Sequence, residues 1–250
     1  MKDNFSGHSP DYARYRPTYP DELYRFLYAQ LNHYDTAWDC GTGNGQVATK
    51  LAEQFTHVYA TDLSENQLAQ APTRPNITYR VEQAEEASFE KQSLDLVTVA
   101  QAIHWFDFDA FYSVVQGALK PDGLLAILGY FMMTVDDAID TVVLQLYEDI
   151  LGDAYWDPER KLIEQRYQTI PFPFADVEVP AFTQSLTWSF DDLVGYLNTW
   201  SAVKHYEKRN GESPVKLIVD DLQDAWGTAA EREVHFPILL RVGTRANGHV

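Results

Sequence analysis

The sequence predicts a doubly wound α/β protein with a helical cap, and three observations support that prediction. Short apolar runs alternate with helical patterns through the first half of the chain, a glycine-rich turn follows the first of these runs, and helices rich in aromatic residues dominate the second half. Strands that alternate with helices form a mostly parallel sheet with helices on both faces. A glycine turn between strand and helix lies at the edge of the sheet where such folds bind ligands.

Five strands are predicted in the first half of the chain. They comprise residues 36–40, 57–61, 77–81, 94–100 and 124–128, with helical patterns at 47–55, 64–71 and 108–119 between them. The fourth strand, L-D-L-V-T-V-A, is typical of a parallel strand covered on both faces, because it is largely apolar and β-branched. Ser64 is a good N-cap for the second helix, which must end near Pro72. Residues 120–123, K-P-D-G, are typical of a turn.

The second half is predicted to form the cap and then to return to the sheet. Apolar residues recur at spacings of one, three and four between residues 134 and 151, which predicts a helix. The prolines between residues 171 and 180 exclude a long helix there. Two more helices are predicted at 190–207 and 214–226, and strands at 177–188 and 234–244.

The composition indicates an acidic globular protein whose partner is a small molecule. The 250 residues include 19 Lys and Arg against 37 Asp and Glu, so the formal net charge is −18. That charge repels nucleic-acid backbones, and no window of about 18 apolar residues could span a membrane. The first 20 residues lack the apolar segment of a secretory signal, so we expect a cytoplasmic location. The expected assembly is a monomer or a homodimer.

No disulfide or metal site is predicted. Cys40 is the only cysteine, which excludes an intrachain disulfide and the multi-cysteine zinc patterns. No spacing of His, Cys and acidic residues matches a known metal site. The neighbouring Asp39 disfavours a reactive thiolate, so we interpret Cys40 as a packing residue.

The most informative segment is the turn at residues 38–45, W-D-C-G-T-G-N-G. Its G-x-G-x-G spacing differs from the G-x-G-x-x-G of dinucleotide sites. Asp39 would repel a pyrophosphate but suits a ligand that carries an ammonium group. Asp62 ends the second strand, 21 positions after Gly41, where an acid can bond both hydroxyls of a ribose. Together these residues favour a cationic amino-acid cofactor over a nicotinamide dinucleotide.

At these residues the sequence resembles the class I S-adenosylmethionine-dependent methyltransferases. D-C-G-T-G-N-G at 39–45 is similar to their motif I, and T-D-L-S at 61–64 to their acidic ribose-binding motif. Q-A-E at 83–85, L-D-L-V-T-V-A-Q-A-I-H-W-F at 94–106 and L-K-P-D-G-L-L-A-I at 119–127 follow in the family's order. The resemblance covers about residues 35–130.

Two further segments resemble a small-molecule branch of this family that includes the trans-aconitate methyltransferases. They are Y-A-R-Y-R-P-T-Y-P at 12–20 and H-W-F at 104–106. The resemblance implies a seven-stranded, mostly parallel sheet whose last strand is antiparallel, with a variable helical cap. We expect residues 1–34 to form an N-terminal lid and first helix, 35–130 the Rossmann-like cofactor-binding core, and 131–250 the cap with the last two strands.

The cofactor that the resemblance implies is S-adenosylmethionine, which leaves S-adenosylhomocysteine as product. The expected cofactor-binding residues are Asp39, Gly41, Thr42, Gly43, Asn44, Asp62, Leu63, Ala84, Glu85 and Gln101. The expected lid or substrate residues are Tyr12, Tyr15, Arg16, Trp105 and Trp200. Alternatives stay open for several of them: Asp62 as a helix N-cap, Glu85 as a solvated acid, the leader around Arg16 as a surface segment, and Trp200 as a core residue.

His104 is the candidate catalytic residue, because it is the only histidine in a predicted active-site loop. As a base it could activate a hydroxyl or an amine, whereas a carboxylate acceptor needs no base. The alternative is a histidine that packs beside Trp105 and holds the loop in place.

The sequence therefore predicts a methyltransferase that acts on a small molecule, with oxygen favoured over nitrogen or carbon as the methyl acceptor. Two alternatives remain at this point. One is a protein that binds the cofactor or its product without turnover. The other is a nicotinamide-dependent oxidoreductase, which the spacing of the glycine turn and Asp39 disfavour. A shared fold does not decide between them.

Overall fold

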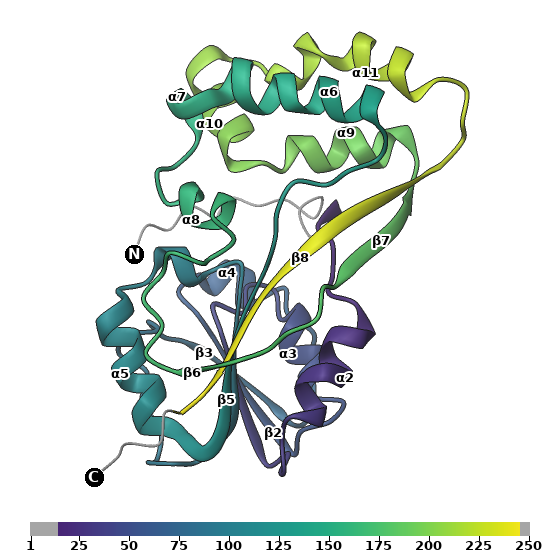
Figure 1. Cartoon of the computed structure of the whole chain (residues 1–250). Helices are drawn as coiled ribbons and strands as arrows, with labels where there is room; N and C mark the ends of the chain where they lie inside the picture. The colour runs from purple at the N-terminus through teal and green to yellow at the C-terminus, as the bar shows by residue number, and fades with distance from the viewer. Residues whose placement is uncertain (1–14, 246–250) are drawn as a thin grey trace.

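The computed structural model describes residues 15–245 and contains an eight-stranded mixed sheet with helices on both faces (Figure 1). The strands are β1 (Thr36–Cys40), β2 (His57–Asp62), β3 (Ile77–Val81), β4 (Leu94–Ala100), β5 (Leu119–Tyr130), β6 (Ala175–Val177), β7 (Thr183–Trp188) and β8 (Arg232–Thr244). Their order is β3-β2-β1-β4-β5-β8-β6, with β7 also paired to β8. Strands β1 to β5 are parallel and β8 is antiparallel to β5. The doubly wound prediction is confirmed.

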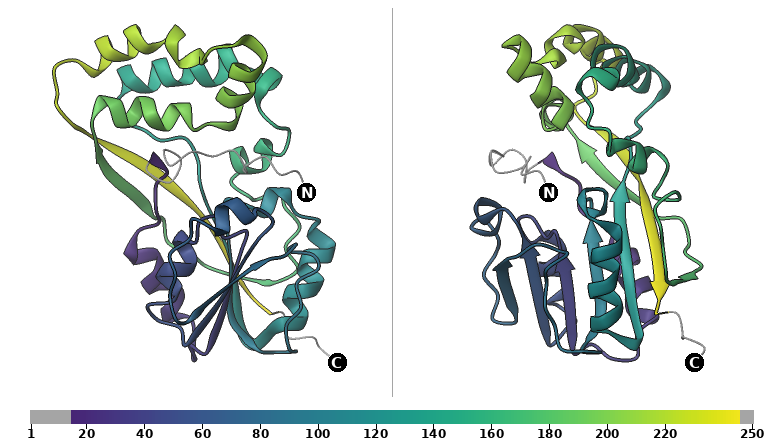
Figure 2. Two further views of the ribbon diagram at one scale, coloured as in Figure 1. Left: turned by 180° about the vertical axis from the view of Figure 1, so that it is seen from behind. Right: turned by 90° about the vertical axis from the view of Figure 1, so that its left-hand side faces the viewer.

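The helices divide into those that flank the sheet and those that form the cap (Figures 1 and 2). The flanking helices are α2 (Asp21–Ala29), α3 (Gln46–Leu51), α4 (Glu65–Leu68) and α5 (Phe108–Ala118), with the short turn η1 (Ile103–Trp105) after β4. The cap helices are α6 (Asp137–Leu144), η2 (Gln145–Leu151), α7 (Gly152–Tyr155), α9 (Phe190–Asn198), α10 (Ser201–Asn210), η3 (Pro214–Leu217) and α11 (Val219–Trp226). Between cap and sheet, α8 (Arg160–Glu164) packs against η1, with Ile163 in the core beneath α5. The cap lies over the carboxyl ends of β1 to β5. No helix within residues 15–245 is long and apolar enough to cross a membrane.

Alternating residues of the central strands supply two separate apolar cores. On β4, Leu96 faces the core that α2 and α3 cover, whereas Val97 and Val99 face the core beneath α5. Every residue of β4 before Ala100 is buried, as expected for a parallel strand covered on both faces. The carboxyl ends of these strands are thereby held in register beneath the cap.

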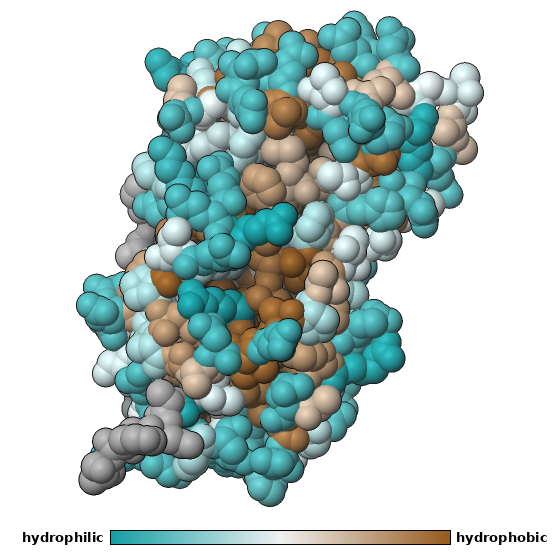
Figure 3. All heavy atoms as spheres, viewed as in Figure 1, coloured by the Kyte–Doolittle hydropathy of each residue, from teal (hydrophilic) through white to brown (hydrophobic). Residues whose placement is uncertain are grey.

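A third apolar core fills the cap and joins it to the sheet. Trp226 of α11 and Leu193 of α9 are fully buried in it, together with Tyr130 from the end of β5 and Phe236 of β8. Strand β8 runs from the cap down into the sheet (Figure 1). Seen from the side of β8, apolar side chains also gather along the seam between cap and sheet (Figure 3).

Several predicted elements differ in the structure, three of them as follows. The strand expected at 177–188 is divided around Pro180 into β6 and β7, which pair with opposite halves of β8, so the described residues form eight strands rather than seven. The helix expected at 190–207 is interrupted after Asn198, where a second helix begins with Trp200 as its N-cap. Residues 120–123 fall within β5 but outside its ladder with β4, whose pairing moves from Leu94↔Leu119 to Leu96↔Leu124.

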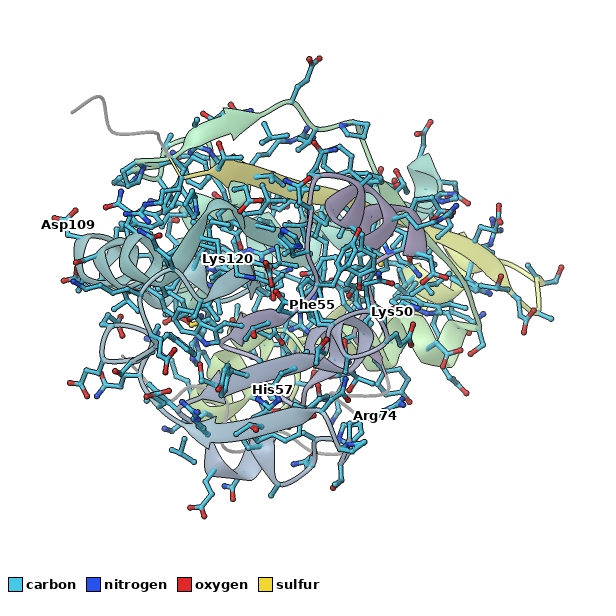
Figure 4. The ribbon with its side chains drawn as sticks, turned by 90° about the horizontal axis from the view of Figure 1, so that it is seen from below. Lys50, Phe55, His57, Arg74, Asp109 and Lys120 are labelled. Atoms are coloured by element: carbon cyan, nitrogen blue, oxygen red, sulfur yellow. The ribbon has the colours of Figure 1, made fainter. Side chains whose placement is uncertain are left out.

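A buried carboxylate fixes the opposite, amino-terminal edge of the sheet. Asp95 of β4 accepts hydrogen bonds from the backbone N–H groups of Asp35 and Thr36, both at 2.9 Å, and pairs with the Lys120 ammonium at 2.7 Å. Figure 4 looks at the molecule from this side and shows Lys120 near its centre. The starts of β1, β4 and β5 are thus joined by one side chain.

Asp95→Ala should lower the free energy of unfolding by about 3 kcal/mol, because two backbone donors and one ammonium lose their buried acceptor. Urea unfolding followed by circular dichroism measures this change. Asp35→Ala is the matched control, since the exposed Asp35 carboxylate also pairs with Lys120 but supports no backbone group. A loss for Asp95→Ala no larger than that of the control would show that this contact is dispensable.

Candidate active site

A pocket opens at the carboxyl ends of the parallel strands, beneath the cap. Its empty volume is about 1130 Å³ with its open mouth included. The predicted site residues that line it are Arg16, Asp39, Gly41, Thr42, Gly43, Asn44, Asp62, Leu63, Gln101 and Trp105. Segments far apart in the sequence therefore meet in one cavity.

The glycine turn has a backbone that only glycine adopts easily. Gly41, Gly43 and Gly45 have φ angles of +67°, +56° and +80°, in the left-handed region. A Cβ on Gly41 would lie 2.6 Å from the Cβ of Ala102, whereas a Cβ on Gly43 would meet nothing closer than 4.0 Å. The space beside Gly43 is thus open for a ligand.

Asp39 is fully buried directly beneath this turn. Its carboxylate accepts hydrogen bonds from the hydroxyls of Thr42 and Thr98 and from the backbone N–H of Ala48, the last at 3.0 Å. Burial raises the pKa of Asp39 from 3.8 to about 6, against the opposing effect of these hydrogen bonds. Asp39 therefore fixes the turn from within while it also lines the pocket.

Asp62 connects the end of β2 to the turn. One carboxylate oxygen accepts the N–H of Gly43 and the other that of Ser64, each at 2.8 Å. A carboxylate oxygen has two acceptor positions, so each oxygen can accept one more hydrogen bond. The N-cap of α4 is Ser64, whose hydroxyl accepts the N–H of Gln67, so the structure does not support the alternative of Asp62 as that N-cap.

Gln101 directly follows β4 in an unusual backbone conformation, with φ at +54°. Its backbone N–H donates to the carbonyl of Leu128, and its side-chain amide donates to the carbonyl of Tyr130 at 3.0 Å. Positive φ values outside glycine are uncommon and cluster at functional sites. These two bonds tie the end of β4 to the end of β5 at the pocket wall.

The expected adenine-side residues are not on the pocket wall. Ala84 is buried, and Glu85 accepts the backbone N–H of Asp107 at 2.9 Å, so it supports the start of α5. Glu82 lines the pocket in its place, with one carboxylate oxygen buried and unpaired among the described residues. Because β3 ends at Val81, Glu82 is the first residue past the strand, and that position could have indicated it.

His104 lies inside the core and does not line the pocket. Its Nδ1 is 3.5 Å from the hydroxyl of Tyr167, and its ring is 4.8 Å from that of Trp105 between ring centres. Burial, and then the charge of Arg160, lower the pKa of His104 from 6.5 to about 3. A neutral, weakly basic imidazole in this setting favours the packing alternative over a catalytic base.

The cap tryptophan expected at the substrate pocket also lies inside a core. Trp200 packs 5.6 Å from Trp156 and 5.9 Å from Tyr147 between ring centres, and it does not line the pocket. This position favours the core alternative. Tyr15 also lies outside the lining, and Tyr12 lies outside the described residues.

The described part of the leader, residues 15–20, forms one wall of the pocket beside the end of β5. Arg16 donates to the hydroxyl of Tyr130 at 3.2 Å and to the carbonyl of Thr199 at 3.0 Å. Tyr19 also lines the pocket, with its ring 6.3 Å from that of Tyr130. Tyr130 was missed because β5 runs two residues beyond its expected end at 128.

Comparisons with known proteins agree with this geometry. The methyltransferase domain family matches residues 38–127. A "Putative methyltransferase" of Dictyostelium discoideum is 32% identical over 245 residues, which cover 95% of this chain and 93% of that protein. The chain belongs to the class I S-adenosylmethionine-dependent methyltransferases.

Solved structures extend this assignment to the whole fold. The structure described as "a Putative Type II Methyltransferase from Anaeromyxobacter dehalogenans" is 39% identical, with a TM-score of 0.85 over 92% of this chain and 98% of that one. The YcgJ protein of Bacillus subtilis is 16% identical, with a TM-score of 0.53 over 91% of this chain and 99% of that one, and shows likeness of fold alone. A Rossmann-like methyltransferase fold is thereby confirmed.

The family match covers some of the residues that line the methyltransferase pocket but not all of them. Residues 38–127 run from β1 into β5 and include the glycine turn, Asp62 and Gln101. They exclude Arg16, Tyr130 and the cap. The wall of the pocket formed by Arg16, Pro17, Tyr19 and Tyr130 therefore lies outside the family match.

Asp39→Asn should change how the stability of this methyltransferase depends on pH. A folded-state pKa of about 6 against 3.8 unfolded means that the folded state favours the protonated acid. The contribution of Asp39 to stability is thus largest below pH 4 and is lost as the pH rises through 6. We expect the unfolding free energy of the wild type relative to the variant to fall by roughly 1.5 kcal/mol between pH 5 and 7.5.

Urea unfolding of both proteins across that range provides the test. Other titrating groups cancel in the difference between the two. Curves that stay parallel from pH 5 to 7.5 would contradict an elevated pKa for Asp39.

Proposed function

We propose that this methyltransferase transfers the methyl group of S-adenosylmethionine to an oxygen of a small-molecule acceptor. The observation that carries the proposal is the arrangement of one pocket between the glycine turn with Asp62 on one side and Arg16 with Tyr130 on the other. The first pair of features suits an amino acid and a ribose. The second suits an anionic or hydrogen-bonding acceptor.

The cofactor end of the pocket offers groups of the right kind for S-adenosylmethionine. When bound, that cofactor supplies a methyl group on a sulfonium, which an acceptor oxygen attacks in line as the carbon–sulfur bond breaks to give S-adenosylhomocysteine. The turn from Gly41 to Asn44 provides open backbone for the methionine part, with Asp39 below it. Asp62 provides the free acceptor positions for ribose hydroxyls, and Leu63 an apolar surface for the adenine.

At the acceptor end a carboxylate is favoured over a hydroxyl. The described residues that line the pocket include no His, Lys or Cys, and its three acids, Asp39, Asp62 and Glu82, lie at the ends of β1 to β3 on the cofactor side. Burial raises the pKa of Tyr19 well above its usual range, so its phenol is no base at neutral pH. A carboxylate is already ionised and needs no base, and the Arg16 guanidinium can donate charge-assisted hydrogen bonds to it. The oxygen lone pair then forms the new O–CH₃ bond without loss of a proton.

The test is a transfer assay with S-adenosylmethionine labelled in its methyl group. Small organic acids, phenols and amines of matched size serve as acceptors. We expect label in a product that mild alkali releases as methanol, because methyl esters hydrolyse whereas methyl ethers and methylamines do not. Gly41→Ala is the inactive control, since the added Cβ would meet Ala102 at 2.6 Å.

The other outcomes of this assay each contradict part of the proposal. Label in an alkali-stable product would replace the carboxylate with a hydroxyl or an amine acceptor. Saturable binding of S-adenosylhomocysteine without transfer to any acceptor would favour the alternative of a non-catalytic binding protein.

Asp62→Asn should weaken binding of S-adenosylhomocysteine by about 1–3 kcal/mol, because ribose hydroxyls lose a charged acceptor. Isothermal titration calorimetry measures the affinity. The matched control is Glu86→Gln, which removes one negative charge from an exposed position outside the pocket. Equal affinities for the two variants would remove Asp62 from the ribose site.

His104→Gln should leave the pH dependence of transfer unchanged above pH 5. With a pKa of about 3, the imidazole is neutral throughout that range and makes no titration visible in the rate. We expect kcat to fall less than about tenfold. A loss of about 10²-fold or more, together with a changed acidic limb in the pH profile, would restore His104 as the catalytic base.

A further inference from the structure

The leader makes contacts with both halves of the molecule at once. Arg16, Pro17 and Tyr19 line the pocket of the core. Arg16 also donates to the carbonyl of Thr199, between α9 and α10, and its guanidinium lies 5.7 Å from the ring centre of Tyr196 on α9. A few consecutive residues thus bridge the cofactor core and one helix of the cap.

The leader packs against that helix at Gly195. It lies inside α9, where glycine is disfavoured relative to alanine. A Cβ at Gly195 would lie 2.5 to 2.7 Å from three carbon atoms of the Tyr15 ring. By contrast, a Cβ at Gly117, inside α5, would meet nothing within 4 Å. The Tyr15 ring therefore packs directly against the backbone of Gly195, where a side chain would not fit. We call this contact the latch.

The latch determines where Arg16 can lie, because Tyr15 and Arg16 are consecutive. The guanidinium of Arg16 then reaches the hydroxyl of Tyr130, whose own carbonyl accepts the side-chain amide of Gln101. One series of contacts thus runs from the end of β4 through Tyr130 and Arg16 to α9.

We propose that Tyr15 and Gly195 are positioning residues for methyl transfer: the latch between them holds Arg16, which binds the acceptor, at the acceptor end of the pocket. In that case, the packing of α9 against Tyr15 also fixes the position of Arg16 at the acceptor end of the pocket. The cofactor end depends on the glycine turn and Asp62, which the latch does not contact. The effect on transfer rests on the proposed function, whereas the latch itself does not.

The experiment compares Gly195→Ala with Gly117→Ala. Both change a glycine inside a helix to alanine, so helix propensity affects them alike, and only the first meets a neighbouring ring. We expect Gly195→Ala to raise the KM of the best acceptor from the transfer assay at least tenfold. The dissociation constant of S-adenosylhomocysteine should stay within about threefold of the wild type, and Gly117→Ala should change neither.

A second variant tests the contact itself. Tyr15→Ala should raise the acceptor KM as Gly195→Ala does, and it leaves room for a Cβ at position 195. The double variant Tyr15→Ala/Gly195→Ala should therefore be no worse than Tyr15→Ala alone. If Gly195→Ala fails to fold, Tyr15→Ala and the double variant carry the test. Additive losses in the double variant would overturn the latch.

Hydrogen exchange separates failure of the latch from failure of the proposed function, since it needs no acceptor. In the wild type with S-adenosylhomocysteine bound, we expect the backbone amides of Arg16, Thr18 and Tyr19 to exchange at least tenfold more slowly than in Gly195→Ala. Equal exchange in Gly195→Ala and Gly117→Ala would refute the latch, whatever the transfer assay shows.

Discussion

The buried carboxylate of Asp39 is the contact on which the pocket depends. It joins β1 to β4 through Thr98, to the glycine turn through Thr42 and to α3 through Ala48. Three elements that meet at the edge of the sheet are thus oriented by one side chain. Because the turn is held from below, its upper side can remain open, as the empty space beside Gly43 shows. Burial makes ionisation of the Asp39 carboxyl group less favourable, and its pKa is therefore raised.

The cap and the sheet are two layers of one unit, because they share strand β8 and the end of β5. Strand β8 supplies residues to the cap core through Phe236 and to the sheet core through Val242. The end of β5 belongs to the same region, since Tyr130 packs in the cap core while its carbonyl binds Gln101. The pocket lies at this junction, and Arg16, Tyr19 and Tyr130 line it beside the strand ends.

Local spacing was sufficient to predict that Asp39, the glycine turn and Asp62 lie together, because strand, glycine turn and helix are consecutive in the chain. Asp39, the turn and Asp62 all lie on the pocket as expected. The same reasoning missed Glu82 and Tyr130, since it expected Glu85 rather than Glu82 on the pocket and ended β5 too early. For His104 and Trp200 it identified the right segment but not the direction of the side chain, which tertiary packing decides. Nothing in the sequence around Gly195 indicates its contact with Tyr15, which joins residues 180 positions apart.

The most direct test of the central claim is a crystal structure with S-adenosylhomocysteine bound. We expect the homocysteine part along the turn from Gly41 to Asn44 and the ribose hydroxyls within hydrogen-bond distance of Asp62. The sulfur should lie between Gln101 and the acceptor end formed by Arg16 and Tyr130. A ligand bound elsewhere, or with its ribose away from Asp62, would contradict it.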